Sequence, residues 1–380
     1  MKRVAALGHS VGRKVSIPLI HCSARGGCDC DCSWANPAAC GADDKTCCHA
    51  CCCKVPTPAP SPSQAPKKQL TLAEAIRIGV EPVLKGLSDN HNQTAWSFSY
   101  RDADIRVSFC VGYTDLASRT PCSAGDLYAW GSATKTHTAL LIVQLAEKGL
   151  FKLADTLVSL ANDYLRAISN GTSDLIQLFG PEVKAVTVRQ LLQMTAGLTE
   201  YDTANTRAYQ NSHRQDDLTP MWVLNVANHT FRCKPGTCGV YSSTNYVLLG
   251  LVAARFQHAS SWDTLDQRAW MQRIPTDLPE VQPGGSFKAL YYGMHGPYSA
   301  FKTAVAADGT HATVHGYQLP LDGTNCSTFL GCPALDVYTM SASGGWTCGN
   351  LVSTSTSVAD FYWALLGPER KKYALLNDKS

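Results

Sequence analysis

Apolar residues recur at helical spacing in several stretches of the chain, and each stretch predicts a helix. Between Leu70 and Leu87 the spacing predicts a helix that Pro82 should kink or end. From Thr138 to Ala146 nearly every residue is apolar, which predicts a helix buried on most of its surface. Lys148 and Gly149 supply the expected C-terminal stop of that helix.

Two further segments alternate in the manner of strands. Residues 95–100 and 105–113 flank an Asp102-Ala103-Asp104 turn and predict a β-hairpin. Cys110 and Cys122 bracket the polar segment that follows and could form a local disulfide. Further along, Thr187 is placed to cap a helix that should stop near Gly197.

Bulk composition narrows the class of protein. The 380 residues leave room for a full-sized catalytic domain and an appendage. A net charge of +3, with no basic stripe, argues against nucleic acid as the main partner. The longest apolar runs are far too short to span a bilayer, so we expect no transmembrane segment.

The amino-terminal region is unusual because ten of the 17 cysteines fall between Cys22 and Cys53. So small a segment cannot bury a sufficient apolar core, and disulfides are the first interpretation of residues 22–53. Thiolate binding of soft metal ions is the alternative. Residues 54–68 alternate proline with small residues and predict a semi-extended linker, so the main domain should cover residues 69–380.

Several features favour a secreted or extracytoplasmic protein. Four Asn-x-Ser/Thr sites, which begin at Asn92, Asn170, Asn228 and Asn325, are compatible with a secretory route and with a glycoprotein. Residues 1–21 carry positive charge and a short apolar run, so they form at best a weak targeting segment.

The first chemical pattern is Gly131-Ser-Ala-Thr-Lys135, at the start of the buried helix. Residues three apart share one helical face, so the hydroxyl of Ser132 and the amine of Lys135 can meet. A serine becomes a nucleophile when a nearby base takes its proton, and helix N-terminal N–H groups favour negative charge on an attacked carbonyl. The alternative is an N-cap serine beside a solvated lysine. The pattern is short, and we interpret its second copy, Ser299 to Lys302, as coincidence.

The second chemical pattern follows a Pro-Gly turn that Cys233 and Cys238 are placed to tie. This turn delivers Tyr241 just ahead of an apolar helix. A phenol can relay protons beside a lysine, and Ser243 and Asn245 are polar groups placed to orient a lysine or a substrate amide. Taken alone, the pattern favours the alternative, in which Tyr241 and Tyr246 are core aromatic residues with satisfied hydroxyls.

Taken together, these stretches resemble the serine β-lactamase and penicillin-binding-protein superfamily, in particular its class C-like group of AmpC-type β-lactamases, D-alanyl-D-alanine carboxypeptidases and related esterases. Five elements occur in the family's order, between about Gln69 and Leu366. They are Gly131-Ser-Ala-Thr-Lys135, Gly149-Leu-Phe-Lys-Leu-Ala-Asp155, Leu191-Leu-Gln-Met-Thr-Ala-Gly-Leu198, Tyr241-Ser-Ser-Thr-Asn-Tyr246, and Ser341-Ala-Ser-Gly-Gly345 with the later Ser353-Thr354.

The resemblance implies an α+β fold, with an antiparallel sheet flanked by helices and a helical subdomain. It also implies acyl transfer on small ester, amide or peptide substrates. Ser132 would form the acyl-enzyme, Lys135 and Tyr241 would move its proton, and the Ser132 N–H would help to bind the oxyanion. Ser243 and Asn245 remain candidate substrate-binding residues. Serine acyl transfer needs no cofactor or metal, and the acyl group and oligomeric state are not predicted.

The sequence departs from the family's pattern in two places. Ser243 stands where the Tyr-x-Asn pattern has asparagine, which favours an esterase-like relative over a true β-lactamase. The family's Lys-Thr-Gly or His-x-Gly strand is not found after Gly345, and His295-Gly296 and His315-Gly316 come too early for it. We therefore expect a fragment that lacks C-terminal strands and leaves the hairpin without a sheet partner. A non-catalytic binding protein of the same fold is the alternative function.

Overall fold

The computed structural model describes residues 70–91, 95–115, 117–227, 229–303, 311–318 and 335–377. The chain divides into two units, Met1–Gln69 and Leu70–Ser380. The predicted targeting segment, cysteine-rich module and linker lie outside the described residues, as do three of the four Asn-x-Ser/Thr asparagines. The description below concerns the second unit.

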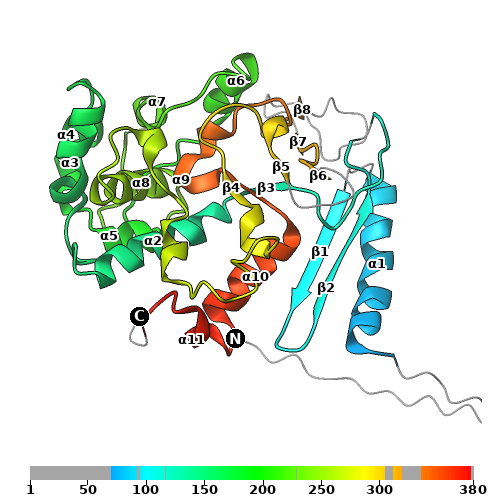
Figure 1. Cartoon of the computed structure of the whole chain (residues 1–380). Coiled ribbons are helices and arrows are strands. Elements are labelled where there is room, and N and C mark those ends of the chain that lie inside the picture. Colours follow the sequence, from blue (N-terminus) through cyan, green and yellow to red (C-terminus); the bar gives the residue numbers. More distant parts are fainter. Residues whose placement is uncertain are drawn as a thin grey trace, which may run out of the picture. The chain divides into compact units, whose positions relative to one another are not determined.

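The second unit is a mixed α+β structure, as predicted (Figure 1). Its helices are α1 (Leu72–His91), α2 (Thr134–Glu147), α3 (Leu157–Ile168), α4 (Leu175–Phe179), α5 (Val188–Leu192), α6 (Ala204–Ser212), α7 (Pro220–Val226), α8 (Thr244–Phe256), α9 (Trp346–Gly349), α10 (Ser355–Leu366) and α11 (Arg370–Tyr373). Its strands are β1 (Ala95–Arg101), β2 (Arg106–Gly112), β3 (Tyr128–Gly131), β4 (Leu290–Tyr292), β5 (Lys302–Thr303), β6 (His311–Ala312), β7 (Tyr317–Gln318), β8 (Leu335–Asp336) and β9 (Leu351–Ser353).

Every pair of adjacent strands in these sheets is antiparallel. A central sheet has the order β3-β9-β4, and β1 and β2 form the predicted hairpin. Helix α1 packs on β2 and α10 packs on β1. Among the described residues β1 pairs with β2 alone. Serine hydroxyls join the hairpin to α10, because Ser355 lies 2.6 Å from Ser97 and 2.7 Å from Ser99.

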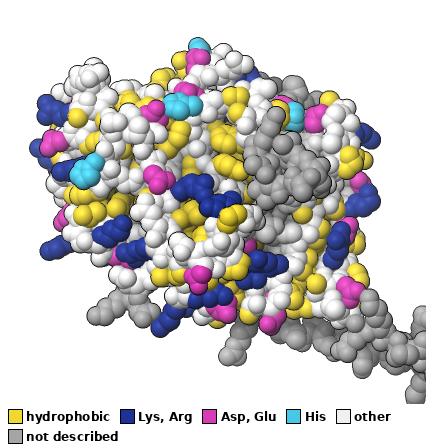
Figure 2. Space-filling model, in the orientation of Figure 1, with side chains coloured by type: hydrophobic (Ala, Val, Ile, Leu, Met, Phe, Trp, Pro, Cys, Tyr) yellow, Lys and Arg dark blue, Asp and Glu magenta, His cyan; other side chains and the backbone are white. Residues whose placement is uncertain are grey.

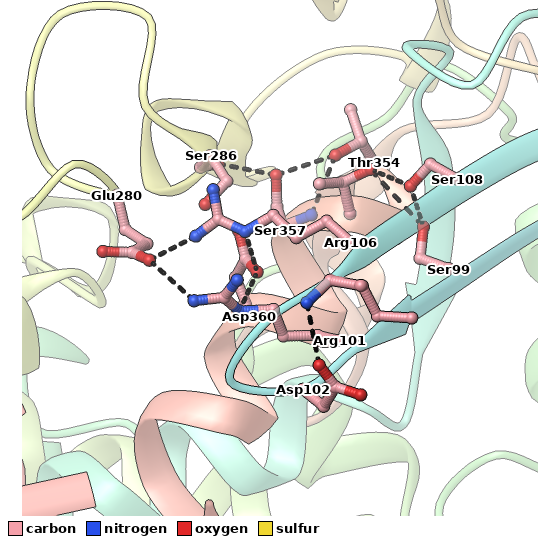
Figure 3. A network of polar contacts seen from close by, with 12 residues as sticks. Ser99, Arg101, Asp102, Arg106, Ser108, Glu280, Ser286, Thr354, Ser357 and Asp360 are labelled. Carbon is pink, nitrogen blue, oxygen red and sulfur yellow. Dashed lines mark hydrogen bonds and ion pairs between the residues drawn. The ribbon is translucent and has the colours of Figure 1, made fainter. Parts of the chain in front are cut away.

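A buried ionic cluster ties the hairpin turn to the rest of this unit (Figure 3). Arg101 and Arg106 flank the turn, and each pairs with both Glu280 and Asp360. The side chains of Glu280 and Asp360 are 3% and 2% exposed. Burial raises the pKa of Asp360 in spite of the two guanidinium groups. The cluster fixes how the hairpin meets α10, which carries Asp360.

The main apolar core lies among the helices on the side of the central sheet away from the β1–β2 hairpin (Figure 1). Helix α8 runs through it, and residues 244–254 are all buried. Helices α2, α3 and α5 each pack against α8. A helix that is apolar all round is stable only in such surroundings. This packing holds the N-termini of α2 and α8, where the candidate catalytic residues lie, in fixed relation.

Pro82 does not end its helix, and the predicted end of the helix that Thr187 caps was wrong. Helix α1 continues through Pro82 to His91, and the carbonyl of Ile78 that Pro82 leaves without a partner belongs to an exposed residue that water can reach. Helix α5 ends at Leu192 rather than near Gly197. Met194 has a φ of 58°, and its carbonyl accepts from Val240 N instead of continuing the helix.

No helix in the described part of the chain is long and apolar enough to cross a membrane. On the face drawn in Figure 2, acidic and basic side chains are interspersed rather than gathered by sign.

Candidate active site

Ser132 lies in the turn between β3 and α2. Gly131, with a φ of 49°, turns the chain out of the strand, and the N-cap position of α2 belongs to Ala133. The Ser132 hydroxyl is therefore not used as a helix cap, which excludes the structural alternative for this serine. The Ser132 N–H has no hydrogen-bond acceptor among the described residues, as expected of an oxyanion donor.

Lys135 lies in the first turn of α2 and is 7% exposed. Its ammonium donates to Ser132 Oγ at 3.0 Å, to Ser243 Oγ at 3.2 Å and to the carbonyl of Cys348 at 2.9 Å. These acceptors are neutral, and no carboxylate pairs with Lys135 within the described ranges. An amine that loses one of these protons is placed to accept the proton of Ser132.

Tyr241 completes the contact on the other side of Ser132. Its hydroxyl lies 2.7 Å from Ser132 Oγ, and Lys135 Nζ lies 5.2 Å from the centre of its ring. The side chain is 59% exposed, so it is not a core aromatic. The core alternative does fit Tyr246, which is 7% exposed and whose pKa burial raises to about 12.

A disulfide and a close main-chain contact at Gly197 hold the loop before Tyr241. The predicted disulfide Cys233–Cys238 is present, as is Cys110–Cys122. Gly197, with a φ of 78°, admits the loop, because a Cβ at this position would lie 2.2 Å from the carbonyl oxygen of Cys233. The main chain of this loop thereby delivers Tyr241 to Ser132.

Ser243 and Asn245 have different positions, although they are only two residues apart. Ser243 is 8% exposed, contacts Lys135 and donates its N–H to Glu200 Oε2 at 2.8 Å. Asn245 is fully buried, and its amide donates to the carbonyl of Ser242 at 3.1 Å and to Met194 Sδ at 3.2 Å. Positions two apart at a helix start point to nearly opposite sides. The structure therefore brings Ser243 into the site and places Asn245 behind it, out of reach of a substrate.

A cavity of about 350 Å³ opens at Ser132, Lys135 and Ser243. Sequence reasoning missed several residues of its wall, which come from segments far apart along the chain: Tyr201, Asp202, Arg207, Gln210, Tyr298, Gly316, Val337, Met340 and Cys348. Two residues separate Tyr201 and Asp202 from one of the five family-like elements, which ends at Leu198, so their closeness in sequence was an available signal. Gly316 belongs to one of the two His-Gly pairs that come too early for the family's strand.

The Asp217 carboxylate joins its own segment to those of His295 and Ser341, and Ser341 lines the cavity. Asp217 accepts from Ser341 Oγ at 2.6 Å and lies 2.7 Å from His295 Nδ1, while Asp263 lies 2.9 Å from His295 Nε2. The hydrogen bond to Asp217 is the main cause that raises the pKa of His295. The His295 imidazole bridges the two carboxylates, and Asp217 in turn holds the segment that carries Ser341.

Cys348 lines the cavity, and its thiol is buried. Burial raises its pKa to about 11, so it stays protonated. Its Sγ lies 3.2 Å from the hydroxyl of Tyr201. Its contribution to the site is the main-chain carbonyl that accepts from Lys135.

Sequence relatives match part of this chain. Protein flp of Staphylococcus aureus (strain NCTC 8325 / PS 47) is 28% identical over 166 residues, which are 44% of this chain and 30% of flp. Penicillin-binding protein 4* of Bacillus subtilis (strain 168) is 24% identical over 178 residues, which are 46% of this chain and 35% of that protein. The chain thus matches about a third of the length of these relatives.

Solved structures match more of the chain. The D-stereospecific amidohydrolase from Streptomyces sp. superposes with a TM-score of 0.55 and 23% identity, covering 79% of this chain and 75% of the other. The D-amino acid amidase from Ochrobactrum anthropi SV3 gives a TM-score of 0.55 at 18% identity, covering 80% and 73%. At these identities the likeness establishes the fold.

Residues 88–379 match the Beta-lactamase family. The chain belongs to this family, and its fold is that of the β-lactamases, penicillin-binding proteins and related amidases.

Proposed function

We propose that this protein is a serine hydrolase that forms an acyl-enzyme on Ser132 with ester or amide substrates. One observation carries the proposal: Ser132 Oγ lies 3.0 Å from Lys135 Nζ and 2.7 Å from the Tyr241 hydroxyl. A nucleophile with two proton-transfer groups in hydrogen-bond reach is the geometry that serine acyl transfer requires.

The proposed reaction has two halves. With Lys135 as the neutral amine, Ser132 Oγ attacks the substrate carbonyl, and the Ser132 N–H stabilises the oxyanion. The serine proton passes to that amine, either directly or through the Tyr241 hydroxyl, which gives up its own proton as it takes one. The bond to the leaving group then breaks, and the leaving amine or alcohol takes up the proton. Water attacks the acyl-enzyme in the second half and regenerates the Ser132 hydroxyl. Ser243 orients Lys135 throughout, because its Oγ accepts from the amine.

Family membership and the fold of known amidases support this function, while the particular activity is our proposal. Asn245 was predicted to contact substrate, and its burial supports an indirect role instead, in which it holds the carbonyl of Ser242 behind the site. The two disulfides support an extracytoplasmic location, because such bonds persist in oxidising compartments.

The test is covalent labelling of the whole chain, followed by intact-mass measurement. A penicillin should add its full mass, and a fluorophosphonate its mass less that of HF, to the wild type and to Ser299→Ala but not to Ser132→Ala. Ser299 is the matched control because it belongs to the other Ser-x-x-Lys copy, whose residues share no helix. Labelling that persists in Ser132→Ala contradicts the proposed nucleophile. A wild type that is folded and never labelled favours the non-catalytic binding protein.

A further inference from the structure

The cavity at Ser132 carries charge at a second place that the proposed mechanism does not use. Lys135, Asp202 and Arg207 are the charged side chains among the described residues that line it. Lys135 belongs to the catalytic group. Asp202 and Arg207 come from the segment that leads into α6 and from α6 itself.

The Asp202–Arg207 pair is held rigidly. Arg207 Nε and Nη2 each donate at 2.7 Å to a different carboxylate oxygen of Asp202. The N–H of Asp202 donates to Glu200 Oε1 at 3.1 Å. Thr206, in the first turn of α6, donates its hydroxyl to the carbonyl of Tyr201 at 2.6 Å. Two side chains in a fixed bidentate geometry are pre-organised for recognition.

Arg207 keeps donors that its partner does not use. A guanidinium carries five N–H groups, and Asp202 occupies two of them. No residue of the described ranges hydrogen-bonds to Nη1, and the side chain is 36% exposed. Gln210 lies on the same face of α6, three positions on, and its amide nitrogen faces the wall at Gly344. Both oxygens of Asp202 accept from Arg207, and the unused N–H groups of Arg207 give this wall free donors.

Resting on the proposed function, we propose that Arg207 determines specificity by binding a carboxylate on the acyl part of the substrate. The free N–H groups of a guanidinium form a fork that matches a carboxylate. A cavity near the lower end of ligand-site volumes suits a short acyl chain, with the reacting carbonyl at Ser132 and the carboxylate at Arg207. The Asp202 carboxylate positions the guanidinium and does not bind the substrate.

Three nitrophenyl esters of similar length test this inference: the neutral butyrate, the glutarate monoester with a free carboxylate, and the 4-aminobutyrate with a free ammonium. We expect the wild type to prefer the glutarate monoester in kcat/KM, after subtraction of the rate without enzyme. Arg207→Gln should lose about ten- to a hundredfold on that ester and less than about threefold on the butyrate. Arg166→Gln is the matched control, because Arg166 also pairs with an aspartate but does not line the cavity; it should leave all three rates unchanged.

The outcomes separate this inference from the proposed function. Hydrolysis of the butyrate by a wild type that does not prefer the glutarate monoester overturns the role of Arg207 and leaves the hydrolase proposal standing. Equal losses on all three esters in a folded Arg207→Gln variant, or a wild-type preference for the aminobutyrate, also overturn it. Failure of the wild type to hydrolyse any ester or to be labelled at Ser132 defeats the proposed function itself. If Arg207→Gln does not fold, the test is whether free glutarate inhibits butyrate hydrolysis by the wild type. Inhibition supports carboxylate binding at Arg207, and a lack of inhibition contradicts it.

Discussion

Lys135 donates a hydrogen bond to the main-chain carbonyl of Cys348 at 2.9 Å, although 213 positions separate the two residues. Both side chains are buried, at 7% and 3% exposure. Because the acceptor is a main-chain carbonyl, it is present whatever the side chain at position 348. The position of the Lys135 amine therefore depends on the backbone fold. The contact joins the first turn of α2 to α9, and it leaves Lys135 facing Ser132 and Ser243.

The role of Tyr241 predicts a strong effect of removing a single oxygen. Tyr241→Phe keeps the ring and loses the hydroxyl that lies 2.7 Å from Ser132 Oγ. We expect kcat to fall roughly 100- to 10,000-fold, because a positioned proton-transfer group contributes about that much. Steady-state kinetics with a nitrophenyl ester measures it. Tyr209→Phe changes an exposed tyrosine that does not line the cavity, so it is the control and should keep its rate. A Tyr241→Phe variant with full activity would exclude proton transfer by this phenol.

The hydrogen bond between Ser243 and Lys135 predicts different activities for two substitutions of this serine. Ser243→Ala removes one of the three acceptors around Lys135, and we expect kcat/KM to fall about tenfold or more, as for a hydrogen bond to a charged group. Ser243→Asn introduces the asparagine of the family's Tyr-x-Asn pattern, and it should speed acylation by a penicillin more than ester hydrolysis. The rate of fluorescent-penicillin labelling reports this change. An alanine variant as active as the wild type would show that Lys135 does not depend on Ser243.

The buried ionic cluster predicts a large loss of stability. Arg101→Met leaves the carboxylates of Glu280 and Asp360 with Arg106 as their remaining partner in the cluster. The free energy of unfolding should fall by about 3–5 kcal/mol, which is typical of breaking a buried pair. Denaturant unfolding measures it. Arg77→Met breaks an exposed pair on α1 and should cost less than about 1 kcal/mol; equal effects in both variants would contradict the importance of the cluster.

His137 predicts a loss of stability in acid. It lies on α2, stacks on Phe361 at 3.7 Å, and burial lowers its pKa to about 3. Because the unfolded histidine titrates near 6.5, the unfolded state binds more protons below that pH, and stability is lost as the pH falls. Between about pH 7.5 and about pH 4.5 the loss from this residue should be roughly 2–3 kcal/mol.

Urea unfolding of His137→Gln at the two pH values checks the origin of that loss. The variant should show a smaller drop than the wild type, since the titrating group is gone. His213→Gln, which changes an exposed histidine, should keep the full wild-type drop. An unchanged drop in His137→Gln would assign the acid sensitivity to other groups.

Local sequence determined much of this protein. The hairpin, the buried helix after Ser132, the capping of α5 by Thr187 and the two short disulfides were all predicted, because each depends on residues close together in the chain. Helical spacing alone placed Lys135 over Ser132. Order and spacing of five elements were enough to indicate the family, which the match over residues 88–379 confirms.

Only the tertiary structure decided which distant groups reach that helix. Tyr241, Ser243 and Cys348 meet Ser132 and Lys135 because α2, α8 and α9 pack around one core, and no local pattern encodes that packing. At the start of α8, Ser243 faces Lys135 in the site, whereas Asn245 is buried in the core. The sequence does not distinguish these two polar residues, because they are only two positions apart. The tertiary structure likewise places the Asp202–Arg207 pair in the wall of the cavity, which the sequence alone does not show.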